Sequence, residues 1–508
     1  MLARAHTFTI EGLHTRHVTV EVDVRAGLPA FTIVGLADAA VREARERVRA
    51  AILNSGYEFP ARRIVASLAP ADVPKVGAAL DLALACALLA ASGQCPRERL
   101  DAHVLFGELA LDGEVRACRG TLAVAQATRQ AGLGRLVLGP SGAREATLVD
   151  GLDVAVAERL SSAVRVLGGG DADPLLARSS DVVRRSAGPG PDLSDVRGQH
   201  HAVRALVIAA AGGHNLLLSG PPGTGKTMLA QRIGSILPPL TRAQAVEVTR
   251  IRGICGSIGG ELVSERPWRA PHHSMTTAGL IGGAQRDSIG EVVLAHHGVL
   301  FLDELSEFAR PVLEALRQPL EDGRVAIVRA RHSTIYPARF MLLAATNPCP
   351  CGYAGVGERC RCSEAELARH RRRLSGPLLD RIDLLAQLDH DAASHASAPA
   401  QIDSARARDL VTAARERQTA RLREDGVTLN AHMDASMLRR LLALDERCEG
   451  MLRSAHERGL LSARGRHRVL RVARTIADLN ESERIRARDL GSAIALRGDA
   501  GLSGKRAA

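Results

Sequence analysis

Residues 220–227 read Gly220-Pro221-Pro222-Gly223-Thr224-Gly225-Lys226-Thr227, between an apolar run that ends at Ser219 and a stretch of helical spacing from Met228. The pattern G-x-x-x-x-G-K-[ST] between a strand and a helix is that of a phosphate-binding loop. Its glycines allow successive backbone N–H groups to turn toward an anion. Lys226 is then expected to reach the β- and γ-phosphates of ATP, and the Thr227 hydroxyl to hold Mg²⁺. An ordinary glycine-rich turn is the alternative.

The size and charge of the chain limit its class. With 508 residues, of which 46% are hydrophobic and 24% charged, the sequence indicates a globular protein of several domains. Its net charge of +11 favours a polyanionic partner, although the arginine- and alanine-rich composition weakens that inference. We find no leader of signal type and no apolar run long enough to cross a membrane. We therefore expect a cytoplasmic protein.

The first 170 residues predict an α+β domain, because strand-like alternation is followed by helical patterns. These patterns fall at 18–24, 30–34, 37–55 and 78–91. Residues 74–79 and 107–120 resemble the two segments that carry the serine and the lysine of Lon-type proteases. A Lon-like site needs a hydroxyl beside an amine, but Ala79 and Leu122 stand at the matching positions. We therefore expect a Lon-like scaffold or docking module without proteolytic activity.

Two further buried-strand patterns end in polar residues. Asp303 and Glu304 follow the apolar run 298–302, and Asn347 follows the run 341–346. Asp303 is predicted to hold Mg²⁺ and Glu304 to polarise the attacking water. Asn347 is predicted to position that water, with a plain turn former as the alternative. The order of these motifs after a phosphate loop favours an ATP hydrolase.

The same region resembles AAA+ ATPases. The resemblance implies that Val196 and Gln199 lie beside the adenine and that Arg381 reaches the active site of a neighbouring subunit. An ion pair with Asp380 or Asp383 of its own subunit is the alternative for Arg381. A site completed by a neighbour implies an oligomer of identical subunits.

Two stretches resemble the magnesium-chelatase-like branch of AAA+ proteins. One is 269–298, whose adjacent histidine pairs we expect to be structural; the other is a predicted hairpin at 321–340. In helicases of this branch such insertions line a pore and grip DNA. Arg329, Arg331 and His332 at the hairpin tip suit contacts with phosphates. A solvated basic turn is the alternative.

Four cysteines gather after the third strand pattern: Cys349, Cys351, Cys360 and Cys362. Such a cluster in a cytosolic chain fits a tetrahedral Zn²⁺ site better than disulfides. The C-x-C spacing is tighter than the usual C-x₂-C, which weakens the match. We expect the cluster to stiffen a loop near the nucleotide.

The C-terminal part predicts only helices, as in an AAA+ lid. Residues 462–465 resemble the second-sensor motif, in which Arg464 would contact the γ-phosphate. Arg466 and Arg468 are close alternatives for that role.

Together the motifs predict a multidomain α/β protein whose order resembles the YifB/ComM family. The expected parts are a Lon-like domain at 1–170, a linker at 171–191, an AAA+ core at 192–388 with a cysteine insertion at 349–362, and a helical lid at 402–502. The resemblance implies a hexameric ATP-driven motor on DNA, with ComM-type members acting as branch-migration helicases in natural transformation. The alternatives are a chelatase-type motor that drives metal insertion and a regulatory chaperone or adaptor with an inactive protease domain.

Overall fold

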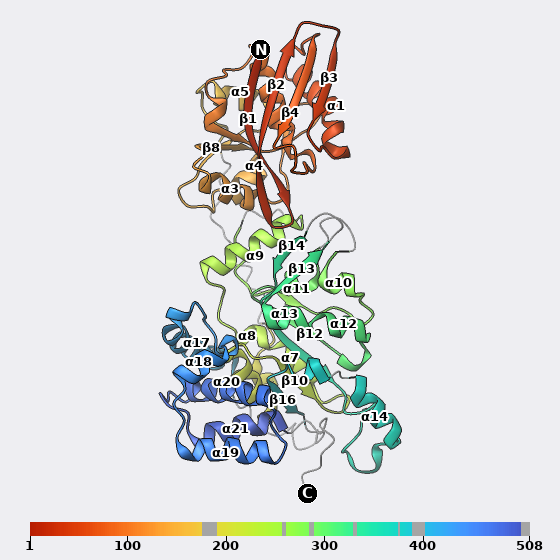
Figure 1. Ribbon diagram of the computed structural model, residues 1–508, viewed down its shortest axis with the longest axis vertical. Helices are drawn as coiled ribbons and strands as arrows, with labels where there is room; N and C mark the ends of the chain where they lie inside the picture. The colour runs from red at the N-terminus through yellow and green to blue at the C-terminus, as the bar shows by residue number, and fades with distance from the viewer. Residues whose placement is uncertain are drawn as a thin grey trace. The chain divides into compact units, whose positions relative to one another are not determined.

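The computed structural model describes residues 1–174, 190–256, 261–283, 289–328, 333–373, 376–388 and 402–498. The chain forms two compact units: unit 1 comprises Met1–Arg184 and Thr241–Val263, and unit 2 comprises Arg185–Leu240 and Ser264–Ala508. Each unit has its own β-sheet with helices packed on it (Figure 1). The predicted multidomain α/β class is confirmed at this level.

The sheet of unit 1 has the strand order β3-β4-β2-β1-β5-β8-β9. β2 pairs antiparallel with β1 and β4, and the other neighbours are parallel. The alternation that predicted a strand at 18–24 buries Val18, Val20 and Val22 completely. The strands are β1 (Leu2–Glu11), β2 (His14–Arg25), β3 (Ala30–Val34), β4 (Arg63–Ala69), β5 (His103–Leu105), β8 (Arg135–Leu138) and β9 (Asp153–Val156), with a small hairpin of β6 (Glu108–Leu109) and β7 (Val115–Arg116).

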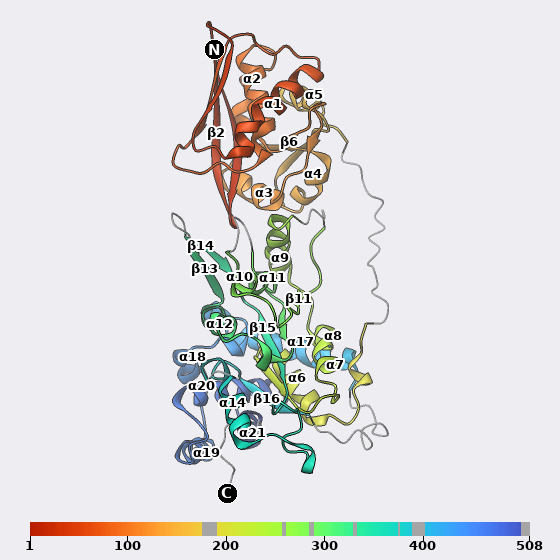
Figure 2. The ribbon, with the colours of Figure 1, turned by 90° about the vertical axis from the view of Figure 1, so that its right-hand side faces the viewer.

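Helix α2 (Asp81–Ala91) is the centre of unit 1, because every one of its residues is buried and it packs on β1 and β2. Figure 2 shows α1, α2 and α5 on the same side of that sheet. At the start of α2, burial raises the pKa of Asp81 to about 6, although Arg47 pairs with its carboxylate at 2.8 Å. The other helices preceding the linker are α1 (Ala39–Asn54), α3 (Thr121–Gln130), α4 (Pro140–Ala146) and α5 (Leu160–Leu167).

Helix α9 (Arg242–Ile254) belongs to unit 1, although in sequence it lies between the motifs predicted to bind a nucleotide. The Arg242 guanidinium donates to both carboxylate oxygens of Asp150 at 2.8 Å. The Gly120 N–H donates to the carbonyl oxygen of Gly253 at 3.2 Å. The sequence prediction included this helix in the core at 192–388, because its residues fall within that range. No local sequence pattern reveals contacts with residues as distant in the chain as Gly120 and Asp150.

The sheet of unit 2 has the order β11-β12-β15-β10-β16, with every neighbouring pair parallel. All side chains of its three central strands are buried, which is why their sequences are continuous apolar runs instead of alternating ones. The strands are β10 (Leu216–Ser219), β11 (Trp268–Arg269), β12 (Val299–Leu302), β15 (Met341–Thr346) and β16 (Leu384–Gln387). A separate hairpin consists of β13 (Arg324–Val328) and β14 (Ser333–Pro337).

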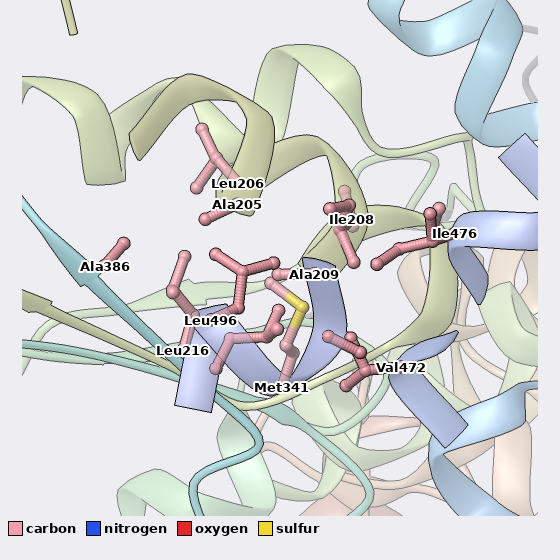
Figure 3. Close-up of a cluster of buried hydrophobic side chains, with 14 of the residues drawn as sticks. Ala205, Leu206, Ile208, Ala209, Leu216, Met341, Ala386, Val472, Ile476 and Leu496 are labelled. Atoms are coloured by element: carbon pink, nitrogen blue, oxygen red, sulfur yellow. The ribbon is translucent and has the colours of Figure 1, made fainter. Parts of the chain in front are cut away.

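The C-terminal helices share one hydrophobic core with this sheet. Helices α17 (Ser404–Arg421) and α20 (Ala463–Leu479) pack on α6 (His200–Gly212), and α21 (Ala487–Gly498) packs on β16. Figure 3 shows the side chains that meet there: Ala205, Leu206, Ile208 and Ala209 of α6, Leu216, Met341 and Ala386 of the sheet, and Val472, Ile476 and Leu496 of the C-terminal helices. Moving these helices away from the sheet would therefore expose apolar surface to water.

The C-terminal helices begin where side chains cap them. Asp403, Asp434, Asp445 and Ser462 each accept a hydrogen bond from a backbone N–H of the first turn. The helices of unit 2 are α6 (His200–Gly212), α7 (Lys226–Gln231), α8 (Ile233–Ile236), α10 (Thr277–Ile281), α11 (Glu291–Leu294), α12 (Arg310–Ala315), α13 (Arg317–Asp322), α14 (Glu364–Arg373), α15 (Gly376–Leu379), α17 (Ser404–Arg421), α18 (Ala435–Leu441), α19 (Glu446–Glu457), α20 (Ala463–Leu479) and α21 (Ala487–Gly498).

Candidate nucleotide site

The predicted nucleotide-binding residues lie together at one edge of the unit 2 sheet. β12, β15 and β10 are parallel neighbours, so their carboxyl ends meet. The phosphate loop follows β10, the acidic pair Asp303 and Glu304 follows β12, and Asn347 follows β15. This edge is where open parallel sheets bind their ligands.

Lys226 connects two of these strand ends. Its Nζ donates to the carbonyl oxygens of Gly220 at 2.7 Å and Pro221 at 2.9 Å, and to Oδ1 of Asn347 at 3.0 Å. Burial lowers the pKa of Lys226, while the nearby carboxylate of Asp303 opposes that shift. The three protons of the ammonium all have acceptors within the protein, so a bound phosphate must replace some of them.

Two glycines give the phosphate loop its shape. Gly223 has φ of +78° and Gly225 has φ of +87°, a region that other residues rarely adopt. Between them, the Thr224 hydroxyl donates to the carbonyl oxygen of Pro221 at 2.9 Å and closes the turn. Gly225 is also the residue from which α7 begins.

Thr227 and Asp303 provide a pair of oxygen atoms suited to Mg²⁺. The Thr227 hydroxyl donates to Oδ2 of Asp303 at 2.7 Å. Neighbouring corners of an Mg²⁺ octahedron with bonds of 2.0–2.1 Å lie about 2.9 Å apart, close to that separation. The other carboxylate oxygen of Asp303 accepts the Glu304 N–H at 2.9 Å, which fixes its orientation. These residues therefore fit the ion.

Glu304 has a strained backbone and a histidine neighbour. Its φ of +50° is unusual for a residue with a side chain, and such strain is typical of functional sites. Its Oε2 lies 3.5 Å from Nδ1 of His273, whose ring meets Phe308 edge-on. The sequence predicts only a structural role for the histidine pairs, because no periodic pattern relates His273 to Glu304.

The segment predicted to lie beside the adenine is fixed to the phosphate-loop region. Val196 and Gln199 are both buried, just before α6. The Arg232 guanidinium donates to the carbonyl oxygen of Asp192 and to the carboxylate of Asp195, each at 2.7 Å. Because Arg232 follows α7 directly, this contact fixes the two segments relative to each other.

Arg381, predicted to reach a neighbouring subunit, is paired within its own subunit in this structure. Its guanidinium forms an ion pair with Glu321 near the end of α13, and its side chain is 11% exposed. An ion pair with Asp380 or Asp383 of its own subunit is the alternative that the sequence offers. Asp383 lies 3.7 Å from Arg468 of α20 and 3.7 Å from Nδ1 of His214.

The three candidate second-sensor arginines of α20 differ in their surroundings. Arg466 pairs with Glu449 at 2.9 Å, and Arg468 lies near Asp383. Arg464 is exposed in the first turn, and within the described ranges it has no carboxylate partner. Of the three, Arg464 is therefore the one whose charge is not already compensated.

The four cysteines of the predicted insertion come together. Their Sγ atoms all lie within 4.8 Å of one another, and none forms a disulfide. The Sγ of Cys349 lies 3.3 Å from that of Cys351 and 3.9 Å from that of Cys360, and the last two are 3.8 Å apart. A cluster of thiols is the donor set that soft metals prefer.

Comparison with known proteins gives the family. The description "Magnesium chelatase, subunit ChlI" matches residues 192–396, "Subunit ChlI of Mg-chelatase" matches 20–141, and "Magnesium chelatase, subunit ChlI C-terminal" matches 401–497. YifB of Escherichia coli is 42% identical over 504 residues, which cover 98% of this chain and 97% of YifB. Competence protein ComM of Haemophilus influenzae is 40% identical over 504 residues, with the same coverage. The chain belongs to the YifB/ComM family.

Membership of the YifB/ComM family supports an ATPase domain of AAA+ type, which implies ATP and Mg²⁺ as cofactors. A more distant relative is RuvB of Mycolicibacterium vanbaalenii, a subunit of the Holliday junction branch migration complex. It is 27% identical over 244 residues, which cover 46% of this chain and 50% of RuvB.

The hairpin of this YifB/ComM member is described up to its tip. β13 and β14 pair from Arg324 with Pro337 to Val328 with Ser333. Arg329, Arg331 and His332, predicted to contact DNA, lie between the two arms and outside the described residues. Their role stays a prediction.

Among the helices of the described ranges, none has both the length and the apolar composition needed to cross a bilayer.

Proposed function

We propose that this protein is a hexameric, ATP-driven motor on DNA that acts as a branch-migration helicase in recombination or natural transformation. The observation that carries the proposal is the meeting of Lys226, Asp303 and Asn347 at one sheet edge. Two findings support the DNA part: similarity to competence protein ComM over nearly the whole chain, and similarity to RuvB over half of that protein.

In this proposal the described residues divide the work of ATP hydrolysis. Lys226 binds the β- and γ-phosphates, and Thr227 and Asp303 would hold Mg²⁺, which would supply positive charge beside the phosphates. Glu304 polarises the attacking water, and Asn347 orients it. Val196 and Gln199 lie beside the adenine, and Arg464 contacts the γ-phosphate from the lid.

Arg381 completes the site of the neighbouring protomer. A guanidinium of this kind stabilises transition-state charge and is worth several orders of magnitude in rate. It must leave Glu321 to do so, and the γ-phosphate offers more negative charge than one exposed carboxylate. Because Arg381 would leave Glu321 to bind the γ-phosphate of a neighbouring protomer, the active form would be an oligomer.

The remaining parts serve the motor. Arg329, Arg331 and His332 at the hairpin tip contact DNA phosphates, which positions the protein without reading sequence. The four cysteines hold Zn²⁺. The domain at 1–170 is a Lon-like docking module without proteolytic activity, joined through the linker at 171–191 to the core at 192–388 and the lid at 402–502. The protein works in the cytoplasm.

ATP turnover of the purified protein, with and without Holliday-junction DNA, tests the proposal together with a mass determination under the same conditions. We expect turnover to rise with junction DNA, hexamers with ATP and DNA, and displacement of labelled junction arms. Lys226→Ala is the control, and it should lose the ATP turnover, the hexamers formed with ATP and DNA, and the displacement of junction arms. A protomer that stays monomeric and shows no turnover with saturating ATP and junction DNA would contradict the proposal.

A second candidate function rests on the matching family descriptions, each of which names magnesium chelatase subunit ChlI. In that case turnover would rise with partner chelatase subunits and a porphyrin instead of DNA. An adaptor role predicts a third result, in which residues 1–170 within the full chain capture protein but the full chain ignores DNA.

A further inference from the structure

The cysteine cluster has the dimensions of a loaded metal site. Zn–S bonds of about 2.3 Å place the sulfurs of a tetrahedral site about 3.8 Å apart. The three separations among Cys349, Cys351 and Cys360 are 3.3, 3.9 and 3.8 Å. Sulfurs in a disulfide would be about 2.05 Å apart. The Ala354 N–H also donates to the Cys349 sulfur at 3.2 Å, so the turn folds around the thiols.

The turn between the first two cysteines and the next pair contacts the phosphate loop. Gly352 has φ of +88°, and its N–H donates to the Cys349 carbonyl oxygen at 2.9 Å. A Cβ at Gly352 would lie 2.6 Å from Cδ of Pro222, a residue of the phosphate loop. The backbone of the cysteine turn therefore lies directly against that loop.

The other end of the cluster leads to the strand end that carries Asn347. Ser363 follows Cys362 and caps α14, where its N–H and hydroxyl donate to the Glu366 carboxylate at 2.8 and 2.9 Å. Further along α14, the buried His370 donates from Nε2 to the Asn347 carbonyl oxygen at 3.0 Å. The side chain of Asn347 in turn accepts from Lys226.

We infer that the four-cysteine site binds zinc as a brace for the nucleotide site. The ion joins the turn against Pro222 to the helix that carries His370, and so fixes the phosphate loop and Asn347 relative to each other. ATP turnover then depends on the metal, although the metal touches neither nucleotide nor water. His370 is a positioning residue in this scheme. The inference rests on the proposed ATP hydrolysis for its activity readout only.

Zinc content and amide hydrogen exchange test the brace on the full chain. We expect about one zinc ion per chain, as in other four-cysteine sites. Removing it with a chelator should speed exchange at 216–228 and 341–348 and lower ATP turnover by about tenfold or more. Adding zinc back should reverse both changes. Cys360→Ser should lose the ion and reproduce them.

Variants of His370 distinguish the loss of the contact between α14 and Asn347 from the loss of the zinc ion. His370→Leu should keep zinc but lower turnover about two- to tenfold, the effect of one lost hydrogen bond. His370→Gln, which retains an N–H donor, should recover part of that loss. The matched control is His103→Leu in unit 1, since buried His103 makes the same kind of bond, through Nδ1 to the Arg99 carbonyl oxygen at 2.6 Å. It should change neither zinc content nor turnover.

Two results would overturn the inference: reduced chain that binds no zinc, or zinc removal that leaves both the exchange of 216–228 and the turnover unchanged. If the zinc-loaded protein hydrolyses no ATP at all, the proposed function fails instead. In that case, the amide hydrogen exchange of 216–228 and 341–348 with and without zinc still tests whether the metal braces these segments.

Discussion

Replacing Lys226 by alanine tests the nucleotide site most directly. In this structure the ammonium donates to two carbonyl oxygens and to Asn347. A hydrogen bond that involves a charged group such as this ammonium contributes about 1.5–3 kcal/mol. Lys226→Ala should therefore cost roughly 2–3 kcal/mol of Mg-ATP binding, because more than one bond to the phosphates is lost. At 1.4 kcal/mol per factor of ten, the affinity should fall about 30- to 150-fold.

The assay is a titration with a fluorescent ATP analogue, in a Glu304→Gln background so that no nucleotide is consumed. The sequence offers a second readout, since its lysines are Lys75, Lys226 and Lys505. Saturating Mg-ATP should protect Lys226 from acylation, as followed by mass spectrometry. Lys75, which has no exposed surface, is the internal reference and should not respond. An affinity loss below about threefold, or equal acylation of Lys226 with and without Mg-ATP, would refute the reasoning.

Three further predictions concern other residues. Glu304→Gln should bind Mg-ATP normally but turn over about 10²- to 10⁴-fold more slowly, as single-turnover kinetics would show; normal turnover would remove Glu304 from the site. Arg381→Ala alone should hydrolyse ATP about 10³-fold more slowly than the unchanged protein. Mixing it with Glu304→Gln should restore part of the ATP turnover, because some interfaces then pair an intact Glu304 site with an intact Arg381 from the neighbouring subunit. If mixed oligomers recovered no turnover, action of Arg381 on a neighbouring subunit would be unsupported. Asp478→Asn should lower the free energy of unfolding in urea by about 3–5 kcal/mol, since its buried carboxylate pairs with Arg421 at 2.7 Å and Arg474 at 3.0 Å. The matched control is the exposed ion pair between Arg466 and Glu449, where Glu449→Gln should lower the free energy of unfolding by less than about 1 kcal/mol. If Asp478→Asn and Glu449→Gln lowered the free energy of unfolding equally, burial would not explain the effect of Asp478.

The strands that end at the candidate nucleotide site were predictable, because burial on both faces of a strand produces a continuous apolar run in the sequence. β10, β12 and β15 are uninterrupted apolar runs, and each ends where polar residues begin. The C-terminal helices were predictable for a related reason, because capping residues such as Asp403 and Ser462 stand at their starts. β1 was missed, since its buried side chains include Thr7 and Thr9 and its pattern is that of a polar segment.

The side-chain contacts between different elements around the candidate nucleotide site were not predictable from the sequence. Glu321 holds Arg381, His370 holds the Asn347 backbone, and His273 lies beside Glu304. Each joins residues on different elements through side-chain geometry that only the folded chain creates. Hydrophobic periodicity and motif spacing describe single elements, so they carry no information about such pairs.

The assignment of α9 to unit 1 changes how this protein can be divided experimentally. A fragment that starts at residue 192 would retain Arg242 and Gly253 but lose Asp150 and Gly120, their partners in unit 1. Val248 and Ile251, buried in the intact chain, are then at risk of exposure on an orphaned amphipathic helix. Poor behaviour of such a fragment would therefore report a severed helix and not a requirement of ATP hydrolysis for the N-terminal region. Deleting 241–263 along with residues 1–191 is the cleaner dissection.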